Sequence, residues 1–351
     1  MLFEPVNKKI NAKKALDINW ARDFFSPRIK KYFPGAQKLL NLDIKINRNF
    51  RGKFRNISLQ YNLDIAFKNK KKTKIVRAKI NSLHLCPKRH YQSLCFLKEN
   101  SFIGLVPRPL DYISSLNMIL YENLEGINFQ NILEEHKNLN PLLTNTPAIA
   151  NFLYKLHHLP IPPKSRNLFR KGGESLELFS RRHWAFLVRK CAPEFYPQMR
   201  YLLDELWREK KKQGISYKDP LMLIHGDFHW GNIILIEQGK IGVIDFGDSC
   251  LDDPLIDVAS FIVQTESMFR YYCPSKERIR NKIIDSFCEN YFQKNISDLE
   301  KKRLFYLKSN KYLQIAAIHA FIEPNPQYKS QGLKILLEKA EESLNNLKIV
   351  L

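Results

Sequence analysis

Cysteine is scarce in this chain of 351 residues, and long apolar runs are missing. The six cysteines form no C-x-x-C pair, so we expect free thiols in a reducing compartment rather than a disulfide framework. No apolar run approaches the roughly 18 residues that a membrane-spanning helix needs. The first residues, MLFEPVNKKINAKK, carry an early acid and lack the apolar core of a secretory signal. These absences predict a cytoplasmic protein with no transmembrane segment.

Negative charge is also in short supply. The chain has 57 Lys and Arg against 35 Asp and Glu, and residues 1–98 hold 24 of these bases but only 5 of the acids. Such a basic N-terminal part indicates an anionic partner, which could be nucleotide phosphates, anionic lipid or nucleic acid. The alternative is compositional, because a chain rich in Lys, Asn, Ile and Phe is typical of an AT-rich genome. On that interpretation the lysine run 68–74 is an exposed hairpin turn.

Apolar residues make up 44% of the chain, which predicts a folded protein, and the length allows two domains or lobes. Residues 1–40 are expected to be helical or irregular. Alternating apolar and polar residues predict strands at 42–46, 57–65 and 74–80, and a helix at 88–99 and a strand at 116–121 follow. Further helices are predicted at 146–159, 174–188, 196–212, 257–269, 276–292 and 298–347, the last broken at Pro324 and Pro326.

The chemistry-bearing stretch is 221–263. Two short apolar runs, 221–224 and 233–236, flank the octet HGDFHWGN, and a third run, 241–244, ends in the acidic tetrapeptide DFGD. This pattern predicts strand, loop, strand, turn, strand and acidic loop. It places Asp227, Asn232 and Asp245 at the ends of neighbouring strands, where their side chains can converge. Two carboxylates and an amide at one point are typical of Mg²⁺-nucleotide phosphoryl transfer.

The spacing of this stretch is that of a kinase. Protein kinases carry H-R-D-x-x-x-x-N followed by D-F-G, and this chain has H-G-D-x-x-x-x-N followed by the same tripeptide, with Gly226 in place of the arginine. Together with DPLIDVA at 253–259, these motifs resemble the aminoglycoside phosphotransferase and choline kinase-like family of small-molecule kinases. The resemblance implies an α+β, two-lobed protein-kinase-like fold. Residues 1–40 would be a helical extension, 41–125 the N-lobe and 126–351 the C-lobe.

The same resemblance implies roles for individual residues. Asp227 would accept the proton of an acceptor hydroxyl, while Asn232 and Asp245 would hold Mg²⁺ beside ATP or GTP. Among the supporting residues, Asp257 would steady the catalytic loop, His157 would be a buried structural histidine, and His225 would support the loop through its ring. His229 and Trp230 are interpreted as packing or substrate-side residues.

In the N-lobe, Lys79 lies where the kinase strand lysine falls and would reach the nucleotide phosphates, with Arg77 on the same strand face as the alternative. Gly52 is the one glycine of the hairpin in the place of the phosphate-covering loop, which departs from G-x-G-x-x-G. Backbone groups from Glu122 to Leu124 would read the adenine edge. The helix that should carry a glutamate for the lysine has none before Glu99, and His90 or Gln92 takes its place.

Other interpretations stay open. His225, Asp227 and His229 form H-x-D-x-H, which is compatible with a hydrolytic metal site. The missing helix glutamate and poor glycine loop fit a catalytically weak kinase-fold binding protein, and the basic N-terminal part fits a nucleic-acid- or membrane-binding protein. The acceptor is open as well. Because no acidic cluster stands out, a hydroxylated metabolite, sugar or glycolipid is favoured over a cationic aminoglycoside- or choline-type substrate.

Overall fold

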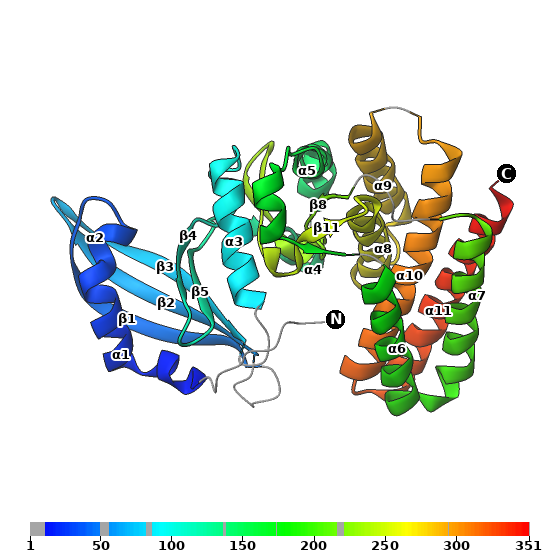
Figure 1. Cartoon of the computed structure of the whole chain (residues 1–351), viewed down its shortest axis with the longest axis horizontal. Coiled ribbons are helices and arrows are strands. Elements are labelled where there is room, and N and C mark those ends of the chain that lie inside the picture. Colours follow the sequence, from blue (N-terminus) through cyan, green and yellow to red (C-terminus); the bar gives the residue numbers. More distant parts are fainter. Residues whose placement is uncertain are drawn as a thin grey trace. The chain divides into compact units, whose positions relative to one another are not determined.

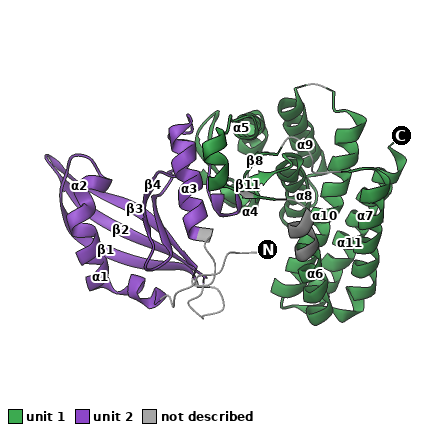
Figure 2. Ribbon diagram, viewed as in Figure 1, with its two compact units in different colours: residues 1–2, 127–241, 250–351 green, residues 3–126, 242–249 purple. Residues whose placement is uncertain are grey.

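The computed structural model describes residues 11–49, 56–81, 86–135, 138–172, 174–215, 221–293 and 295–350. The chain divides into two compact units (Figure 2). The described residues up to Gly126, together with Gly242–Ser249, form the sheet unit. Ile127–Ile241 and the chain from Cys250 onward form the helical unit. The predicted division at residues 40 and 125 stays a prediction.

The sheet unit is built on one five-stranded antiparallel sheet (Figure 1). Its order is β1-β2-β3-β5-β4, and the strands are β1 (Ala36–Asn49), β2 (Asn56–Phe67), β3 (Lys70–Asn81), β4 (Pro109–Ile113) and β5 (Met118–Glu122). Strict alternation explains β2, whose odd-numbered residues from Ile57 to Ile65 are buried while the intervening polar residues are partly exposed. The predicted strands are confirmed, but only residues 68 and 69 of the lysine run form the hairpin turn, and the rest of the run belongs to β3.

The N-terminal segment covers the apolar face of this sheet. It contains η1 (Ala12–Leu16), α1 (Ile18–Phe25), η2 (Ser26–Arg28) and α2 (Ile29–Tyr32). Asp17 caps α1 by accepting hydrogen bonds from two backbone N–H groups of its first turn. The buried rings of Phe25 and Tyr32 join Tyr61 in the core, and the Tyr61 hydroxyl donates to the Ala15 carbonyl at 2.7 Å.

One boundary differs from the prediction. β1 begins at Ala36, although alternation is visible in the sequence only from Leu42. The pairing of β1 with β2 shifts register between Ala36 and Lys38 and again between Leu39 and Asn41. Each irregularity reverses which residues face the core, so the first part of the strand has no period-2 pattern.

Helix α3 (Cys86–Glu99) lies beside β4 and β5 and also contacts the short helix η7 (Phe246–Asp248). Residue 243 ties this late segment to the sheet unit, because the Val243 N–H donates to the Leu105 carbonyl at 2.8 Å. The D-F-G tripeptide is therefore part of the same compact unit as Lys79, although 166 residues separate Lys79 from Asp245 in the sequence.

The helical unit contains two small three-stranded sheets, ordered β10-β9-β6 and β7-β11-β8. Their strands are β6 (Ile127–Asn128), β7 (Arg170–Lys171), β8 (Met222–Ile224), β9 (Ile233–Glu237), β10 (Lys240–Val243) and β11 (Cys250–Asp252), the chain passing into the sheet unit within β10. Its α-helices are α4 (Phe129–Glu135), α5 (Asn140–His157), α6 (Glu174–Cys191), α7 (Tyr196–Lys212), α8 (Leu255–Tyr272), α9 (Glu277–Phe292), α10 (Asp298–Ile322) and α11 (Pro326–Ile349).

These helices confirm the predicted ones, including the break at Pro324 and Pro326. A capping box between Ser297 and Glu300 begins α10, and the Asn325 side chain caps α11. Packed aromatic rings form part of the core, with Trp230 against Phe261 at 4.8 Å between centroids.

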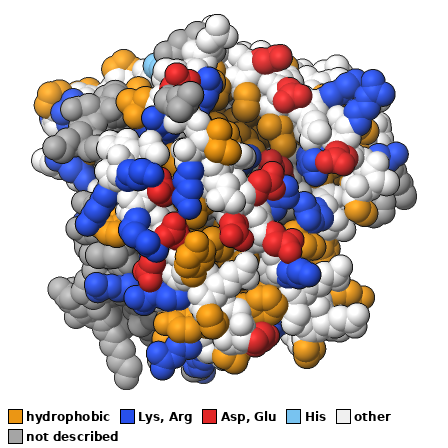
Figure 3. Space-filling model, turned by 90° about the vertical axis from the view of Figure 1, so that its right-hand side faces the viewer, with side chains coloured by type: hydrophobic (Ala, Val, Ile, Leu, Met, Phe, Trp, Pro, Cys, Tyr) orange, Lys and Arg blue, Asp and Glu red, His pale blue; other side chains and the backbone are white. Residues whose placement is uncertain are grey.

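Acidic and basic side chains are interspersed on the face of the helical unit shown in Figure 3. Lys348 of α11 and Arg208 of α7 both pair with Glu205, and Arg200 pairs with Asp204. Surface pairs of this kind contribute about 0–1 kcal/mol each. None of the helices in the described ranges is both long and apolar enough to cross a membrane.

Phe25→Ala is expected to lower the stability of the sheet unit by about 3–5 kcal/mol, because the fully buried ring leaves a cavity between Tyr32 and Tyr61. Phe24→Ala is the matched control, since this neighbouring ring is only partly buried. Urea unfolding followed by tryptophan fluorescence measures both. Equal losses in the two variants would contradict the packing described for α1.

Candidate active site

The loop His225–His229 follows β8, and one carboxylate binds its first two N–H groups. Asp257, in the first turn of α8, accepts hydrogen bonds from the His225 N–H (2.6 Å) and the Gly226 N–H (2.9 Å). Gly226 has φ +85°, a conformation that glycine adopts without steric cost. This requirement explains why a glycine stands where protein kinases carry an arginine.

Asp257 is itself fixed by a buried network. His157 Nε2 lies 3.1 Å from its Oδ2, and His157 Nδ1 lies 2.7 Å from the hydroxyl of Tyr291. The side chains of His157 and Asp257 are fully buried. The structure thus places both residues in the supporting positions expected from the sequence.

The backbone of Asp227 is fixed at both ends. Its N–H donates to Nδ1 of His225 (3.2 Å), and its carbonyl accepts a hydrogen bond from Nδ2 of Asn232 (2.9 Å). Since the amide nitrogen of Asn232 is committed to the loop, its Oδ1 is turned away from that carbonyl and is the atom left for a ligand. The predicted pair Asp227 and Asn232 therefore lies together in the helical unit.

Two cationic or proton-bearing groups flank the Asp227 carboxylate. His229 Nε2 lies 3.4 Å from Oδ2, and the ammonium of Lys311, from α10, lies 3.7 Å from Oδ1. Burial raises the pKa of Asp227, but the hydrogen bond from His229 and the positive charge of Lys311 lower it by more than burial raises it. The pKa of Asp227 therefore lies well below its usual range. Asp227 is therefore ionised at neutral pH.

His229 has a defined tautomer. Its Nδ1 accepts a hydrogen bond from the Gly231 N–H at 3.0 Å, so the ring proton is on Nε2, which faces Asp227. A Cβ on Gly231 would lie 2.8 Å from the His229 ring, so glycine at 231 leaves room for this histidine. Trp230 is fully buried and donates to Thr265, which makes it a packing residue.

In the sheet unit, Lys79 and Asp245 form an ion pair at 2.5 Å. Burial lowers the pKa of Lys79, but the nearby Tyr121, Asp245 and Asp248 outweigh burial and raise it above its ordinary value. Asp245 has φ +68°, an unfavourable conformation for a residue with a side chain. Such strain is often found where a side chain must be aimed for function.

Arg77, the alternative to Lys79, has another partner. It lies on the same face of β3, but its Nε donates to the Asn123 side chain at 3.0 Å. Within the sheet unit, Lys79 is therefore the strand cation that meets the carboxylate of the D-F-G tripeptide.

The predicted hinge residues are only partly available. The Glu122 N–H donates to the Arg108 carbonyl at 2.9 Å, and its carboxylate pairs with Lys74 and Arg108. Burial raises the pKa of Glu122, but the hydrogen bonds from these two cations lower it below its usual value. No described residue accepts a hydrogen bond from the Leu124 N–H. Gly52 lies outside the described residues.

Helix α3 carries His90 where the sequence lacks a glutamate. His90 is buried and packs against Tyr121 of β5, with ring centroids 5.3 Å apart. The lysine that a helix glutamate would orient is instead paired with Asp245.

The donor atoms fit a hard cation such as Mg²⁺. Asp245 offers carboxylate oxygens and Asn232 an amide oxygen, and Mg²⁺ prefers oxygen ligands, usually taking one or two carboxylates from the protein and the rest from phosphates and water. In the ranges that the structure describes, no group of three or more His, Cys, Asp or Glu could hold a metal. The hydrolytic site considered for His225, Asp227 and His229 is therefore not found there.

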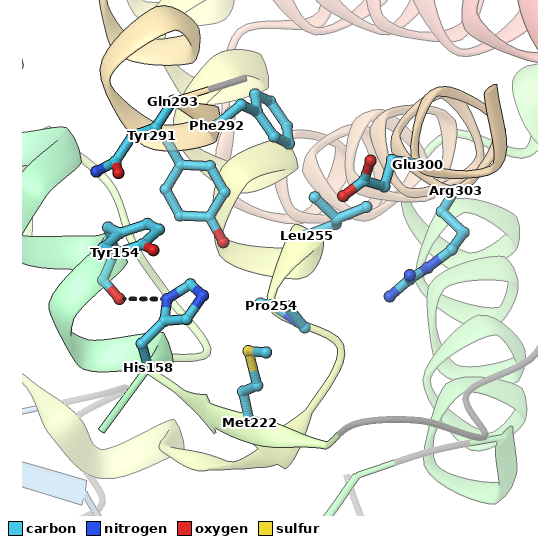
Figure 4. Close-up of a pocket in the computed structure, with 10 residues that line it drawn as sticks. All are labelled: Tyr154, His158, Met222, Pro254, Leu255, Tyr291, Phe292, Gln293, Glu300 and Arg303. Atoms are coloured by element: carbon cyan, nitrogen blue, oxygen red, sulfur yellow. Dashed lines mark hydrogen bonds between the residues drawn. The ribbon is translucent and has the colours of Figure 1, made fainter. Parts of the chain in front are cut away.

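A cavity of about 510 Å³ lies at the far end of the Asp257 network (Figure 4). Tyr291 is shared between the two, since its ring lines the cavity and its hydroxyl bonds His157. Across the cavity, Arg303 pairs with Asp253 at 2.6 Å. The remaining lining residues are Tyr154, His158, Met222, Pro254, Leu255, Phe292, Gln293 and Glu300.

The sequence comparison decides the family. The model of the phosphotransferase enzyme family matches residues 90–292, which include most of α3, the catalytic loop and the D-F-G tripeptide. The chain belongs to this family. Its members are small-molecule kinases, so the chain is an enzyme of that class. No curated protein matches the chain in a sequence search.

Solved structures agree with the family on the fold. Spectinomycin phosphotransferase in complex with ADP and spectinomycin superposes with a TM-score of 0.56 at 13% identity, over 93% of this chain and 98% of that one. Choline kinase from Streptococcus pneumoniae gives 0.56 at 14% identity, over 92% and 99%. Ethanolamine kinase from Plasmodium vivax gives 0.53 at 14% identity, over 88% and 82%. The predicted α+β protein-kinase-like fold is confirmed.

Lys311 was not found from the sequence. It is one of many lysines in the C-terminal helices and lies 84 positions after Asp227, with no motif around it. Only the packing of α10 brings it to the carboxylate.

Asp257→Ala is expected to destabilise the phosphotransferase by on the order of 3 kcal/mol, because it leaves two buried N–H groups and His157 without their acceptor. Asp204→Ala, which removes an exposed carboxylate paired with Arg200, should change stability by less than about 0.5 kcal/mol. Thermal and urea unfolding measure both. A similar small effect for Asp257→Ala would mean that this carboxylate does not hold the loop.

Proposed function

We propose that this phosphotransferase transfers the γ-phosphoryl group of ATP or GTP, with Mg²⁺, to a hydroxyl of a small molecule. The observation that carries the proposal is the ion pair of Lys79 and Asp245. The sequence singles out these two residues for separate tasks on one triphosphate, and in the sheet unit they meet at 2.5 Å. A bound Mg²⁺-nucleotide would separate them, Lys79 moving to phosphate oxygens and Asp245 to the cation.

The proposed chemistry at Asp227 is a proton transfer coupled to phosphoryl transfer. The acceptor oxygen forms a bond to the γ-phosphorus while the bond from that phosphorus to the β,γ-bridging oxygen breaks, which releases the nucleoside diphosphate. The hydroxyl proton passes to the Asp227 carboxylate. Because its pKa is low, Asp227 is a weak base, so it mainly orients the hydroxyl and takes the proton late.

Lys79 would balance negative charge on the phosphates, and Asn232 and Asp245 would supply the protein ligands of Mg²⁺. When bound, Mg²⁺ neutralises charge that develops on the phosphate oxygens. The Asn232 amide is already oriented by the Asp227 carbonyl, so its oxygen needs no reorganisation to bind a cation. Asp257 acts through the loop backbone and is a positioning residue.

For the nucleotide base, the Leu124 N–H is the favoured donor, since the Glu122 N–H is already donated within the sheet unit. Glu122 would contribute its carbonyl to the hinge, and its ion pairs with Lys74 and Arg108 would hold it in place. Gly52 stays the proposed backbone contact to the phosphates.

The acceptor is proposed to be a small hydroxylated molecule such as a metabolite, sugar or glycolipid. The similar structures are described as kinases of spectinomycin, choline and ethanolamine, so an aminoglycoside- or choline-type substrate is the alternative. A further anionic partner for the basic N-terminal part and a cytoplasmic location stay predictions. Some cations of that part are already paired, Lys71 with Asp64 and Lys74 with Glu122.

Mg²⁺-ATP or Mg²⁺-GTP is expected to raise the Tm of the native chain, since a ligand at 100 times its Kd adds about 2.7 kcal/mol of stability. Asp245→Asn and Lys79→Met should lose this rise, and Arg77→Met should keep it because Arg77 is bound to Asn123. Differential scanning fluorimetry with and without EDTA measures the shift. No shift with either nucleotide would favour a kinase-fold binding protein that does not use nucleotide.

Asp227→Asn is expected to retain the nucleotide-dependent rise in Tm but to lose about 10²–10⁴-fold in kcat once an acceptor is found, because only the proton acceptor is removed. Release of ADP or GDP in a coupled assay measures the rate. Full activity in Asp227→Asn would show that another group orients the hydroxyl.

A further inference from the structure

The side chain of Lys311 is largely buried, and among the described residues its ammonium has only one ion-pair partner. Its side chain is 12% exposed, and its acidic neighbour among the described residues is Asp227. The separation of 3.7 Å exceeds the 2.7–3.2 Å of a good N–H···O hydrogen bond. An ammonium has three donors, so a ligand beside Asp227 could accept hydrogen bonds from Lys311.

The preceding lysine of α10, Lys308, has a closer acidic partner. Lys308 has similar exposure, at 19%, and its ammonium reaches Glu266 at 3.3 Å, within the distance of a weak hydrogen bond. Lys308 therefore has a hydrogen-bond acceptor within the protein, whereas the ammonium of Lys311 lies 3.7 Å from the carboxylate that is proposed to bind the acceptor hydroxyl.

The geometry limits where the acceptor can lie. His229 Nε2 is directed at Oδ2 of Asp227, which leaves Oδ1 as the oxygen for the hydroxyl. A hydroxyl within about 3.2 Å of Oδ1 lies no more than roughly 7 Å from the Lys311 ammonium, given the 3.7 Å between Oδ1 and Nζ. At such a distance charges interact with little screening by salt.

We propose that Lys311 selects an anionic acceptor, a small alcohol that carries a carboxylate or phosphate group within a few bonds of the hydroxyl that is phosphorylated. The anion would complete the hydrogen bonds of the ammonium and hold the hydroxyl against Asp227. A cationic group in the same place would be repelled by the positive charge of Lys311. This inference rests on the proposed phosphoryl transfer at Asp227.

The alternative is that Lys311 contacts the transferring phosphoryl group. The two roles differ in a measurable way. A cation on the phosphoryl group would assist every acceptor equally, while a cation on the acceptor would assist only those that carry negative charge.

Two matched sets of acceptors test the proposal with the full chain and Mg²⁺-nucleotide. One set is glycerate, glycerol and 3-aminopropane-1,2-diol, and the other is glucose 6-phosphate, glucose and 6-amino-6-deoxyglucose. The members of each set differ at one position, which carries an anionic, a neutral or a cationic group, and the two sets separate carboxylate from phosphate recognition. Nucleoside diphosphate release gives kcat/KM for each compound.

We expect the native chain to prefer the anionic member of at least one set. Lys311→Met should lower kcat/KM for that member roughly 10- to 100-fold, the range expected for a hydrogen bond to a charged group, and change the neutral member by less than about threefold. Lys311→Arg should restore much of the preference, and Lys308→Met should leave it unchanged.

Three results would overturn the proposal. The native chain could prefer the neutral or cationic members, or Lys311→Met could lose the same factor in kcat/KM for all three members. The third result is that no anionic member is turned over while Mg²⁺-nucleotide still raises the Tm. Failure of the proposed function is a separate result, because then neither nucleotide raises the Tm of the native chain. The charge of the acceptor and the use of nucleotide are therefore tested independently.

Discussion

The carboxylate of Asp257 is the constraint on which the catalytic loop depends. It accepts hydrogen bonds from the first two N–H groups of the loop and contacts His157, which is held in turn by the hydroxyl of Tyr291. With the start of the loop fixed, Gly226 turns the chain and the backbone of Asp227 is bound at both its N–H and its carbonyl. The backbone of Asp227 is therefore held in place, and its carboxylate is where a substrate hydroxyl would bind. A loop prepared in this way loses little entropy when substrate arrives.

A second constraint acts in the sheet unit, where residues from distant parts of the sequence meet. The chain leaves the helical unit within β10 and returns to it after Ser249, and the intervening segment is bound to Leu105. This path brings Asp245 to Lys79, and the ion pair compensates in part for the unfavourable φ of Asp245. The same pair makes a helix glutamate unnecessary for neutralising Lys79 when nucleotide is absent. His90, one of the two residues expected in place of that glutamate, packs against Tyr121.

Much of the fold could be predicted because local signals are strong where one face of an element is buried. β2 alternates without interruption, and the helix predicted at 196–212 has the observed bounds of α7. The start of β1 could not be predicted, since its irregular pairing removes the alternation. Among the candidate site residues, the spacing of Asp227, Asn232 and Asp245 is a local motif that the sequence displays directly. Lys311 was not, because its approach to Asp227 depends on how α10 packs, and that information is spread over many residues of the core.

The central proposal is that Lys79, Asn232 and Asp245 bind one Mg²⁺-nucleotide. A crystal structure of the chain with Mg²⁺ and a non-hydrolysable ATP or GTP analogue tests it most directly. The account predicts that Lys79 leaves Asp245 for a phosphate oxygen, and that Asn232 Oδ1 and an Asp245 oxygen lie about 2.0–2.1 Å from Mg²⁺. A nucleotide bound elsewhere, with the pair of Lys79 and Asp245 intact at 2.5 Å, would contradict the account.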